Sequence, residues 1–472
     1  MKLFAFSRPG LMLMTSVMIL ATVGVVRWLG SPVNSTPYVS PAPVIRANGN
    51  ASDTQVLQAQ LGTADTQTTI NTLQTRIRQS PDTAKLYAQL GWAYVQRLRE
   101  TADASLYTQA AQSFDEALKR DGKDVDAMLG QGSLALSRHE FAQAITWGEK
   151  AKTINPFRAQ IYGVIGDAEI ELGRYADAIQ TIQKMINTRP DLGSYSRVSY
   201  VRELHGDVDG AIEAMRKAVE SGNPIHESTL WSQYQLGNLY FNKGDLTQAE
   251  QTYQAAIQVK PDYIFARAGL AKINAVHGVI DYKPALLKSA ISELENINEL
   301  LPLPEFVIAL GDLYEADHDL QKAQTQFDLV RAIQKLNATA SMNVDMEMAL
   351  FEADRLPTPN TPLSLPDTVE RGASSVVERA RAAYTHRPSI YAADTLAWAL
   401  YKQGNFTEAQ RYSTEALKLN TRDAMLHFHA GMIARAAGDT ATAKQHLQTA
   451  LSINPYFSIR YAPEAKQVIA TM

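Results

Sequence analysis

The sequence repeats itself with a period of 34 residues, and this repetition limits the possible folds more than any other feature of the chain. A shift of 34 positions carries Pro156 onto Pro190 and Ala144 onto Ala178. Periods of about 20 to 50 residues are typical of solenoids, in which each unit buries its apolar face against its neighbours. We therefore expect an extended array of paired helices, not one globular core.

One stretch, Leu236–Asp262, shows the repeating unit in full. Gly237 on a first helix and Ala249 on a second are small where two antiparallel helices must approach closely, and large apolar residues fill the space between the helices. Gly244 makes the turn, and Pro261 ends the second helix because its ring cannot continue one. The stretch resembles the tetratricopeptide repeat, a unit of two antiparallel helices.

The same pattern recurs ten times between residues 81 and 457, and three of the copies are less regular than the other seven. The resemblance implies an all-α superhelical solenoid of about ten helix pairs. An amphipathic helix from Asp65 to Gln79, with Ile70, Leu73 and Ile77 on one face, is expected to cover the open N-terminal edge of the array. The segment 461–472 is expected to cap the other end.

These patterns divide the chain into six segments. The segments are an N-terminal hydrophobic segment (1–30), a Pro/Ser/Thr-rich flexible stalk (31–63), a capping helix (64–80), an array of about seven repeats (81–355), a Pro-rich segment (356–368), and the C-terminal repeats with their cap (369–472). The Pro-rich segment is interpreted as a long loop inside one repeat, with a hinge between two arrays as the alternative.

The N-terminal segment has the order of features that is typical of an export signal. Lys2 and Arg8 precede an uncharged apolar run from Gly10 to Val26. The run has no A-x-A cleavage site near its end, so a single-pass membrane anchor of bacterial type is favoured over a cleaved signal peptide. Both interpretations place the repeats outside the cytoplasmic membrane, either anchored to it or secreted.

Composition and motifs exclude several classes of function. The chain has no cysteine, which removes disulfides, thiolate zinc sites and thiol nucleophiles. Its net charge of -4 and its well-mixed charges leave no basic stripe for nucleic acid. His427 and His429 lie two positions apart on a predicted helix and point to different faces. Gly130, Gly132 and Ala135 fit a dinucleotide fingerprint, but no strand precedes them. We predict no cofactor, no metal and no catalytic activity.

The family resemblance also implies where a partner would bind. In tetratricopeptide-repeat proteins the first helix of each pair lines a concave groove, and particular positions on that helix contact the ligand. Carried over to this sequence, these positions form an aromatic surface with acidic spots, although some of the rings are expected to pack against the neighbouring repeat. The predicted partner-binding residues are Trp92, Asp167, Tyr200, Trp231, Tyr234, Asn238, Phe241, Asp312, Tyr391, Trp398 and Tyr401.

Charge on the expected groove suggests what kind of partner would fit it. The acidic residues Asp167, Glu171, Asp312 and Glu315 would attract a basic or neutral segment. We therefore expect a non-catalytic scaffold that binds a protein or an extended peptide on an open inner wall. A small-ligand or glycan receptor that uses the aromatic groove is the alternative, and an enzyme is the third class considered.

Overall fold

The computed structural model describes residues 66–101, 103, 105–339, 343–357 and 367–472. These residues form twenty-two helices, α3 to α24, and no strand. The predicted anchor and stalk, and most of the predicted Pro-rich loop, lie outside the described residues. Within the described ranges, no helix combines the length and the apolar character that crossing a membrane requires.

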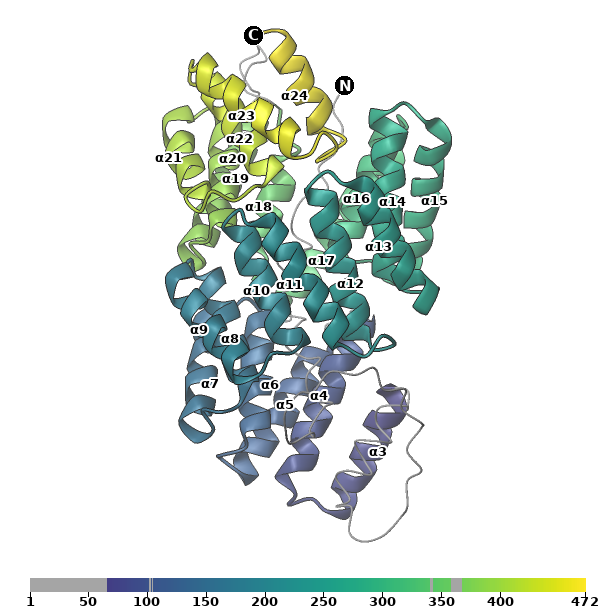
Figure 1. Ribbon diagram of the computed structural model, residues 1–472, viewed down its shortest axis with the longest axis vertical. Helices are drawn as coiled ribbons and strands as arrows, with labels where there is room; N and C mark the ends of the chain where they lie inside the picture. The colour runs from purple at the N-terminus through teal and green to yellow at the C-terminus, as the bar shows by residue number, and fades with distance from the viewer. Residues whose placement is uncertain (1–65, 102, 104, 340–342, 358–366) are drawn as a thin grey trace, which may run out of the picture.

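The described helices are arranged as ten antiparallel pairs between two single helices (Figure 1). The single helices are α3 (Thr66–Gln79), which packs against α4 where a capping helix is predicted, and α24 (Tyr461–Ala470). In each pair we call the first helix A and the second helix B. The pairs are α4 (Ala84–Thr101) with α5 (Ser105–Arg120), α6 (Val125–Ser137) with α7 (Phe141–Ile154), α8 (Ala159–Glu171) with α9 (Tyr175–Thr188), α10 (Leu192–Leu204) with α11 (Val208–Ser221), α12 (Glu227–Asn242) with α13 (Leu246–Val259), α14 (Ile264–Ile280) with α15 (Pro284–Leu300), α16 (Pro304–Ala316) with α17 (Leu320–Thr339), α18 (Asp345–Ala353) with α19 (Asp367–His386), α20 (Ile390–Gln403) with α21 (Phe406–Ala416), and α22 (Ala424–Ala436) with α23 (Thr440–Ile453).

Large side chains of the B helices lie against small residues of the A helices. Phe114 of α5 is fully buried, and a Cβ atom added at Gly91 of α4 or at Gly130 of α6 would overlap its ring. Tyr253 of α13 lies in the same way against Gly237 of α12. One ring therefore joins two successive A helices, which confirms the role predicted for the small residues.

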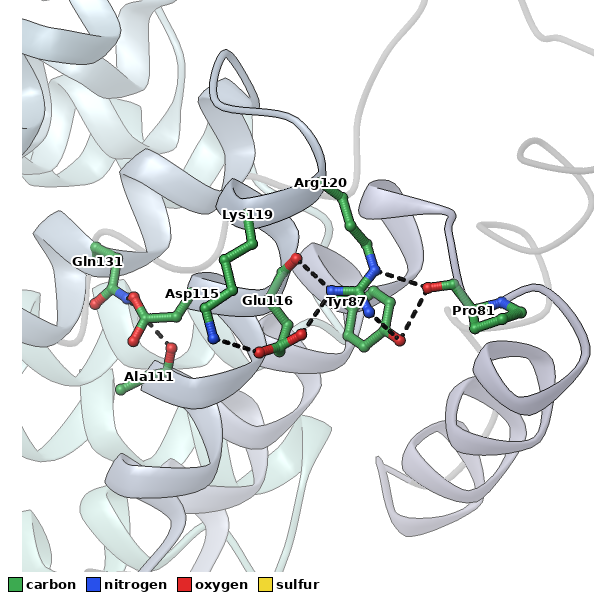
Figure 2. Close-up of polar contacts among 8 residues, drawn as sticks. All are labelled: Pro81, Tyr87, Ala111, Asp115, Glu116, Lys119, Arg120 and Gln131. Carbon is green, nitrogen blue, oxygen red and sulfur yellow. Dashed lines mark hydrogen bonds and ion pairs between the residues drawn. The ribbon is translucent and has the colours of Figure 1, made fainter.

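A polar network fixes the loop between α3 and α4 to the first pair (Figure 2). The guanidinium group of Arg120 lies 4.0 Å from the ring centre of Tyr87, and its Nε donates to the backbone oxygen of Pro81 at 2.7 Å. The same guanidinium donates to the Glu116 carboxylate at 2.6 Å. Beside this network, the Gln131 side chain of α6 hydrogen-bonds to α5. The N-terminal end of the array is thus held by side chains as well as by helix packing.

The array coils so tightly that its C-terminal pairs lie against its N-terminal pairs (Figure 1). The A–B turns of four early pairs meet the loops that precede α18, α20, α22 and α24. Hydrogen bonds between these turns or their helices and the later segments join residues 204 to 218 positions apart, which is about six repeat lengths. We call this line of contact the seam. Its turn residues His139, Gly173, Gly206 and Gly244 lie against the loop residues Asn343, Pro388, Asn420 and Asn454, respectively.

Polar and apolar contacts both stabilise the seam. The Asn454 side-chain amide donates to the backbone oxygen of Phe241 at 2.8 Å, and the hydroxyl of Tyr175 accepts from the backbone N–H of Ile390 at 2.8 Å. Side chains of α8 to α10 share one apolar cluster with side chains of α18 to α22. The prediction of an open, curved ribbon is therefore wrong in one respect: successive superhelical turns of this chain touch.

Candidate functional site

The tight coil buries most of the residues that are predicted to face a partner. Trp92, Tyr234 and Asn238 are half-buried. The other eight residues are at most 8 % exposed: Asp167, Tyr200, Trp231, Phe241, Asp312, Tyr391, Trp398 and Tyr401. The prediction of an open surface is wrong for these eight, because neighbouring A helices and the seam cover them. Partner binding by any of the eleven stays a prediction.

The acidic residues of the expected groove are paired with arginines of the same chain. The pairs are Asp167 with Arg197 at 2.8 Å, Glu171 with Arg387 at 3.7 Å, Asp312 with Arg355 at 2.9 Å, and Glu315 with Arg460 at 3.3 Å. Three of these four arginines follow residue 343 in the sequence, so the C-terminal repeats supply the positive charge. The expectation that these carboxylates attract a basic segment of a partner is corrected accordingly.

Arg387 is the centre of a buried cluster that contains two carboxylates. One of its terminal nitrogens donates to Glu347 at 2.5 Å, and the other lies 3.7 Å from Glu171. Burial raises the pKa of Glu171 to about 7, although Arg387 opposes this shift. His139 donates from Nδ1 to the backbone oxygen of Asn343 at 2.5 Å, and burial lowers its pKa to about 4. The histidine is thus neutral at ordinary pH, and Arg387 is the cation that balances these carboxylates.

The aromatic residues predicted on α20 also have partners inside the protein. Trp398 stacks against His429 at 4.1 Å and against Tyr401 at 4.8 Å between ring centres. Its indole nitrogen donates to Asp354 at 2.9 Å, and the hydroxyl of Tyr461 donates to the same carboxylate oxygen at 2.7 Å. Through these contacts Trp398 joins α20 to α22 and α24, and Tyr401 packs against Trp398 in the same cluster.

A different group of aromatic side chains keeps partial access to solvent. Trp231 and Tyr234 of α12, Phe265 of α14 and Phe306 of α16 form a continuous row, which we call the aromatic wall. Its neighbouring ring centres lie 5.0 to 5.9 Å apart. Tyr234 and Phe265 are half-buried, whereas Trp231 and Phe306 are buried beside them. The wall therefore spans three successive A helices and offers rigid, partly exposed apolar area on α12 and α14.

One member of the aromatic wall could have been predicted from the 34-residue period, although it is not among the positions carried over from the repeat family. Phe265 lies 34 residues after Trp231, at the equivalent position of the next repeat. The match to the repeat is irregular in α14, which concealed this equivalence. Phe306 has no equivalent among the predicted positions, and only the structure places it beside Phe265 at 5.9 Å.

Polar atoms at the aromatic wall are buried without a hydrogen-bond partner among the described residues. They are the indole nitrogen of Trp231, the hydroxyl of Tyr263 and one carboxyl oxygen of Glu305. Burial raises the pKa of Glu305 to about 7 and that of Tyr234 to about 12. The wall thus combines apolar rings with an N–H donor, a phenol donor and a carboxyl group that is easily protonated. Such a surface can bind an apolar side chain next to a peptide carbonyl.

Titration of Glu305 gives the site a testable pH dependence. Because the folded-state pKa is raised from 4.5 to about 7, the folded protein holds this proton more tightly than the unfolded chain does. The contribution of this proton to the free energy of unfolding is fully present below about pH 4.5 and is lost as the pH rises through about 7. Between about pH 5 and about pH 8, the free energy of unfolding of the protein should fall by roughly 1–3 kcal/mol more than that of Glu305→Gln. Urea unfolding at the two pH values measures this difference, and an equal fall in both proteins would contradict the assignment.

No group of three or more His, Asp or Glu side chains among the described residues is arranged to hold a metal ion. The pair His427 and His446, 3.0 Å apart between Nδ1 atoms, has no third ligand of this kind in that part of the chain.

Comparison with known protein families identifies a known repeat in several parts of this chain. Family models of the tetratricopeptide repeat match residues 99–159, 159–192, 231–263 and 395–456. The matches lie in both the N-terminal and the C-terminal pairs. These regions of the chain therefore match the tetratricopeptide repeat.

Individual proteins resemble parts of the chain. The peroxisomal targeting signal receptor of Komagataella phaffii is 24% identical over 180 residues, which are 36% of this chain and 30% of the receptor. The chain thus spans less than a third of the length of this relative. Among solved structures, TTC0263 of Thermus thermophilus is similar with 21% identity, covering 40% of this chain and 98% of that protein at a TM-score of 0.36. YrrB, described as a protein with an unusual peptide-binding site, shows 19% identity over 41% of this chain and 95% of its own, with a TM-score of 0.26.

Proposed function

We propose that this protein is a non-catalytic scaffold that binds another protein, or an extended peptide of it, at the aromatic wall. The observation that carries the proposal is the partial exposure of Tyr234 and Phe265 in a coil that buries most other inner-wall aromatics. Large aromatic side chains supply much of the binding energy at protein interfaces, because they offer rigid area at a small entropic cost.

The polar atoms of the wall favour a peptide over a purely apolar ligand. A buried donor without a partner is costly, and a peptide carbonyl could accept from the Trp231 indole nitrogen or the Tyr263 hydroxyl. The glycan receptor, which is the alternative interpretation of the sequence, would use the same rings. The curated relative is named as a receptor for a targeting signal, and a role of the same kind fits the wall.

The location of this activity is part of the proposal. The charged residues before the apolar run 10–26 and the absence of a cleavage site favour a scaffold that is anchored to the membrane, with its repeats outside the cytoplasm. Since the chain has no cysteine, a single Tyr282→Cys substitution at an 84 % exposed residue provides a unique label site. A membrane-impermeant maleimide should label this variant in intact cells, and labelling only after lysis would contradict the proposed location.

Photo-crosslinking tests the binding partner. A benzophenone amino acid at position 234 of the full chain should capture a protein in intact cells, and the same probe at the exposed Tyr282 should not capture that protein. Shortening both Tyr234 and Phe265 to alanine should weaken the affinity for the captured partner by at least about tenfold.

Two outcomes would overturn the proposal. In the first, the partner binds the double alanine variant and the unsubstituted protein equally well. Tyr282→Ala is the matched control for this comparison. In the second, sugars shift the thermal unfolding of the protein and neither the captured protein nor its peptides do so, which would assign the wall to a glycan.

A further inference from the structure

One loop sequence occurs twice in the chain, once inside the seam and once on the surface. The loop before α24 reads Ile453-Asn454-Pro455-Tyr456, and the loop before α8 reads Ile154-Asn155-Pro156-Phe157. Both loops have the same local turn, since the asparagine Oδ1 accepts from the backbone N–H two residues later, at 2.8 Å in the first loop and 3.2 Å in the second. The two segments are thus the same structural element in two environments.

In the seam, this element lies on the A–B turn between α12 and α13. The turn residue Gly244 faces Ile453 and Asn454, and the Asn454 amide donates across the seam to the oxygen of Phe241 at 2.8 Å. Ile453 and Asn454 are 6 % and 1 % exposed. The loop therefore has a defined binding surface, which is a left-handed glycine turn together with the backbone oxygen three residues before it.

The surface copy of the loop has no such cover. Phe157 is 85 % exposed and Ile154 is 38 % exposed, and Asn155 and Pro156 are also exposed. We call the pairs whose A–B turns lie in the seam, α6 to α13, the earlier tier, and the helices whose preceding loops lie on those turns, α18 to α24, the later tier. Other loops between pairs of the earlier tier expose apolar residues too, including Ile225, which is 74 % exposed. The element that is covered in the seam is therefore uncovered at this second position.

Two turns of the C-terminal pairs have the conformation of the occupied turn. Gly404 and Gly438 have φ angles of 89° and 85°, compared with 85° for Gly244. In all three turns the glycine N–H donates to the oxygen three residues earlier, and the next N–H donates to the oxygen five residues before it. A Cβ atom added at Gly404 or Gly438 would meet nothing within 4 Å, whereas one at Gly244 would contact the docked loop.

We infer that a second copy of this chain docks here, with its loop 154–157 seated on the Gly404 or Gly438 turn of the first copy. This contact would extend the seam from one molecule to the next. It joins two different surfaces of the chain, so each added copy presents a fresh loop and a fresh turn. The expected assembly is therefore an open-ended, head-to-tail stack. The inference goes beyond the proposed function and does not depend on the aromatic wall.

The occupant is identified by continuity with the seam. Inside one chain, loops of the later tier already lie on turns of the earlier tier at four successive positions. The earlier tier retains exposed loops, and the later tier retains exposed turns. Only another copy of the chain brings both the matching Asn-Pro loop and the matching turn in the same spatial order.

Crosslinking of two single-cysteine chains tests this contact directly, because the natural chain contains no cysteine. A full-length Phe157→Cys chain is mixed with an Ala437→Cys chain and, separately, with a Gln403→Cys chain, the partners in each mixture carrying different tags, and both test mixtures are treated with a short bismaleimide. A covalent dimer that carries both tags is expected in at least one test mixture, and its yield there should exceed by at least about tenfold that of Phe157→Cys mixed with Glu250→Cys on the exposed face of α13. One chain carrying both Lys243→Cys and Tyr456→Cys, the equivalent positions in the seam, is the positive control for the reach of the reagent.

Sedimentation supplies an independent measurement. The mean mass of the full chain should rise between about 1 µM and about 200 µM. Phe157→Asp should abolish this rise, and Ile179→Asp, at a residue 42 % exposed on α9, should leave it unchanged. Equal yields of the mixed dimer in both test pairs and the Glu250→Cys pair, or equal association of Phe157→Asp and Ile179→Asp, would overturn the inference.

Discussion

Replacing Arg387 by methionine is expected to lower the free energy of unfolding by about 3–5 kcal/mol. Arg387, Glu171 and Glu347 are each at most 5 % exposed, and Arg387 lies next to both carboxylates. Its removal leaves two buried acidic groups without their cation. Because Arg387 directly precedes the seam residue Pro388, the backbone N–H of Ile390 should also exchange with solvent faster. Urea unfolding and hydrogen exchange measure the two effects.

The matched control is Arg381→Met on α19, the helix that ends one residue before Arg387. Arg381 pairs with Glu408 at 2.9 Å, but its side chain is 45 % exposed. Exposed ion pairs contribute little because water and salt screen them, so a change below about 1 kcal/mol is expected. If Arg387→Met and Arg381→Met changed the unfolding free energy equally, the role given to the Arg387 cluster would be wrong.

Shortening Phe114 to alanine is expected to cost about 3–5 kcal/mol. The ring is fully buried, and the glycines at 91 and 130 leave space that no other side chain is placed to fill. The cavity would lie between the first two A helices, so it should weaken the contact between pairs as well as the first pair itself. Thermal and urea unfolding of the full chain measure the loss.

An exposed phenylalanine provides the control for this substitution. Phe157→Ala removes the same number of atoms from a side chain that is 85 % exposed, and at low protein concentration it should change stability by less than about 0.5 kcal/mol. A similar loss in Phe114→Ala and Phe157→Ala would show that Phe114 does not join the A helices as described.

The helix pairs were predictable because their signals are local. The spacing of Gly237, Ala249 and Pro261 reflects contacts between residues that are close in sequence, and the same pattern recurs in α4 to α23. A repeat of this kind specifies how one pair packs on the next. The family models match four of these regions for the same reason.

Closure of the coil was not predicted because it depends on small angles between pairs that accumulate over about six repeats. The repeat pattern does not record these angles. A sequence signal for burial was nevertheless present in α20, Ile390–Gln403, whose residues are mostly apolar on every face. A helix of this type is usually covered on all sides, and this one is, since nearly all its residues are buried.

Most of the predicted site residues are buried, where the prediction placed them on an open groove. Trp231 and Tyr234 do belong to a row of inner-wall aromatics, but Trp398 and Tyr401 are core residues of the C-terminal pairs. Positions carried over from an open solenoid assume that nothing covers the inner wall. In this chain the inner wall is covered wherever an arginine or a loop of the C-terminal pairs reaches it.

The seam also changes how the molecule can come apart. A linear array unravels one unit at a time from either end, because each unit is held only by its neighbours. Here a hydrogen bond such as that from Asn454 to Phe241 links segments 213 positions apart, so the last units restrain units near the middle of the chain. Such pairings form late, since a long intervening chain must be ordered first. The protein should therefore fold slowly and, once folded, resist stepwise loss of its C-terminal helices.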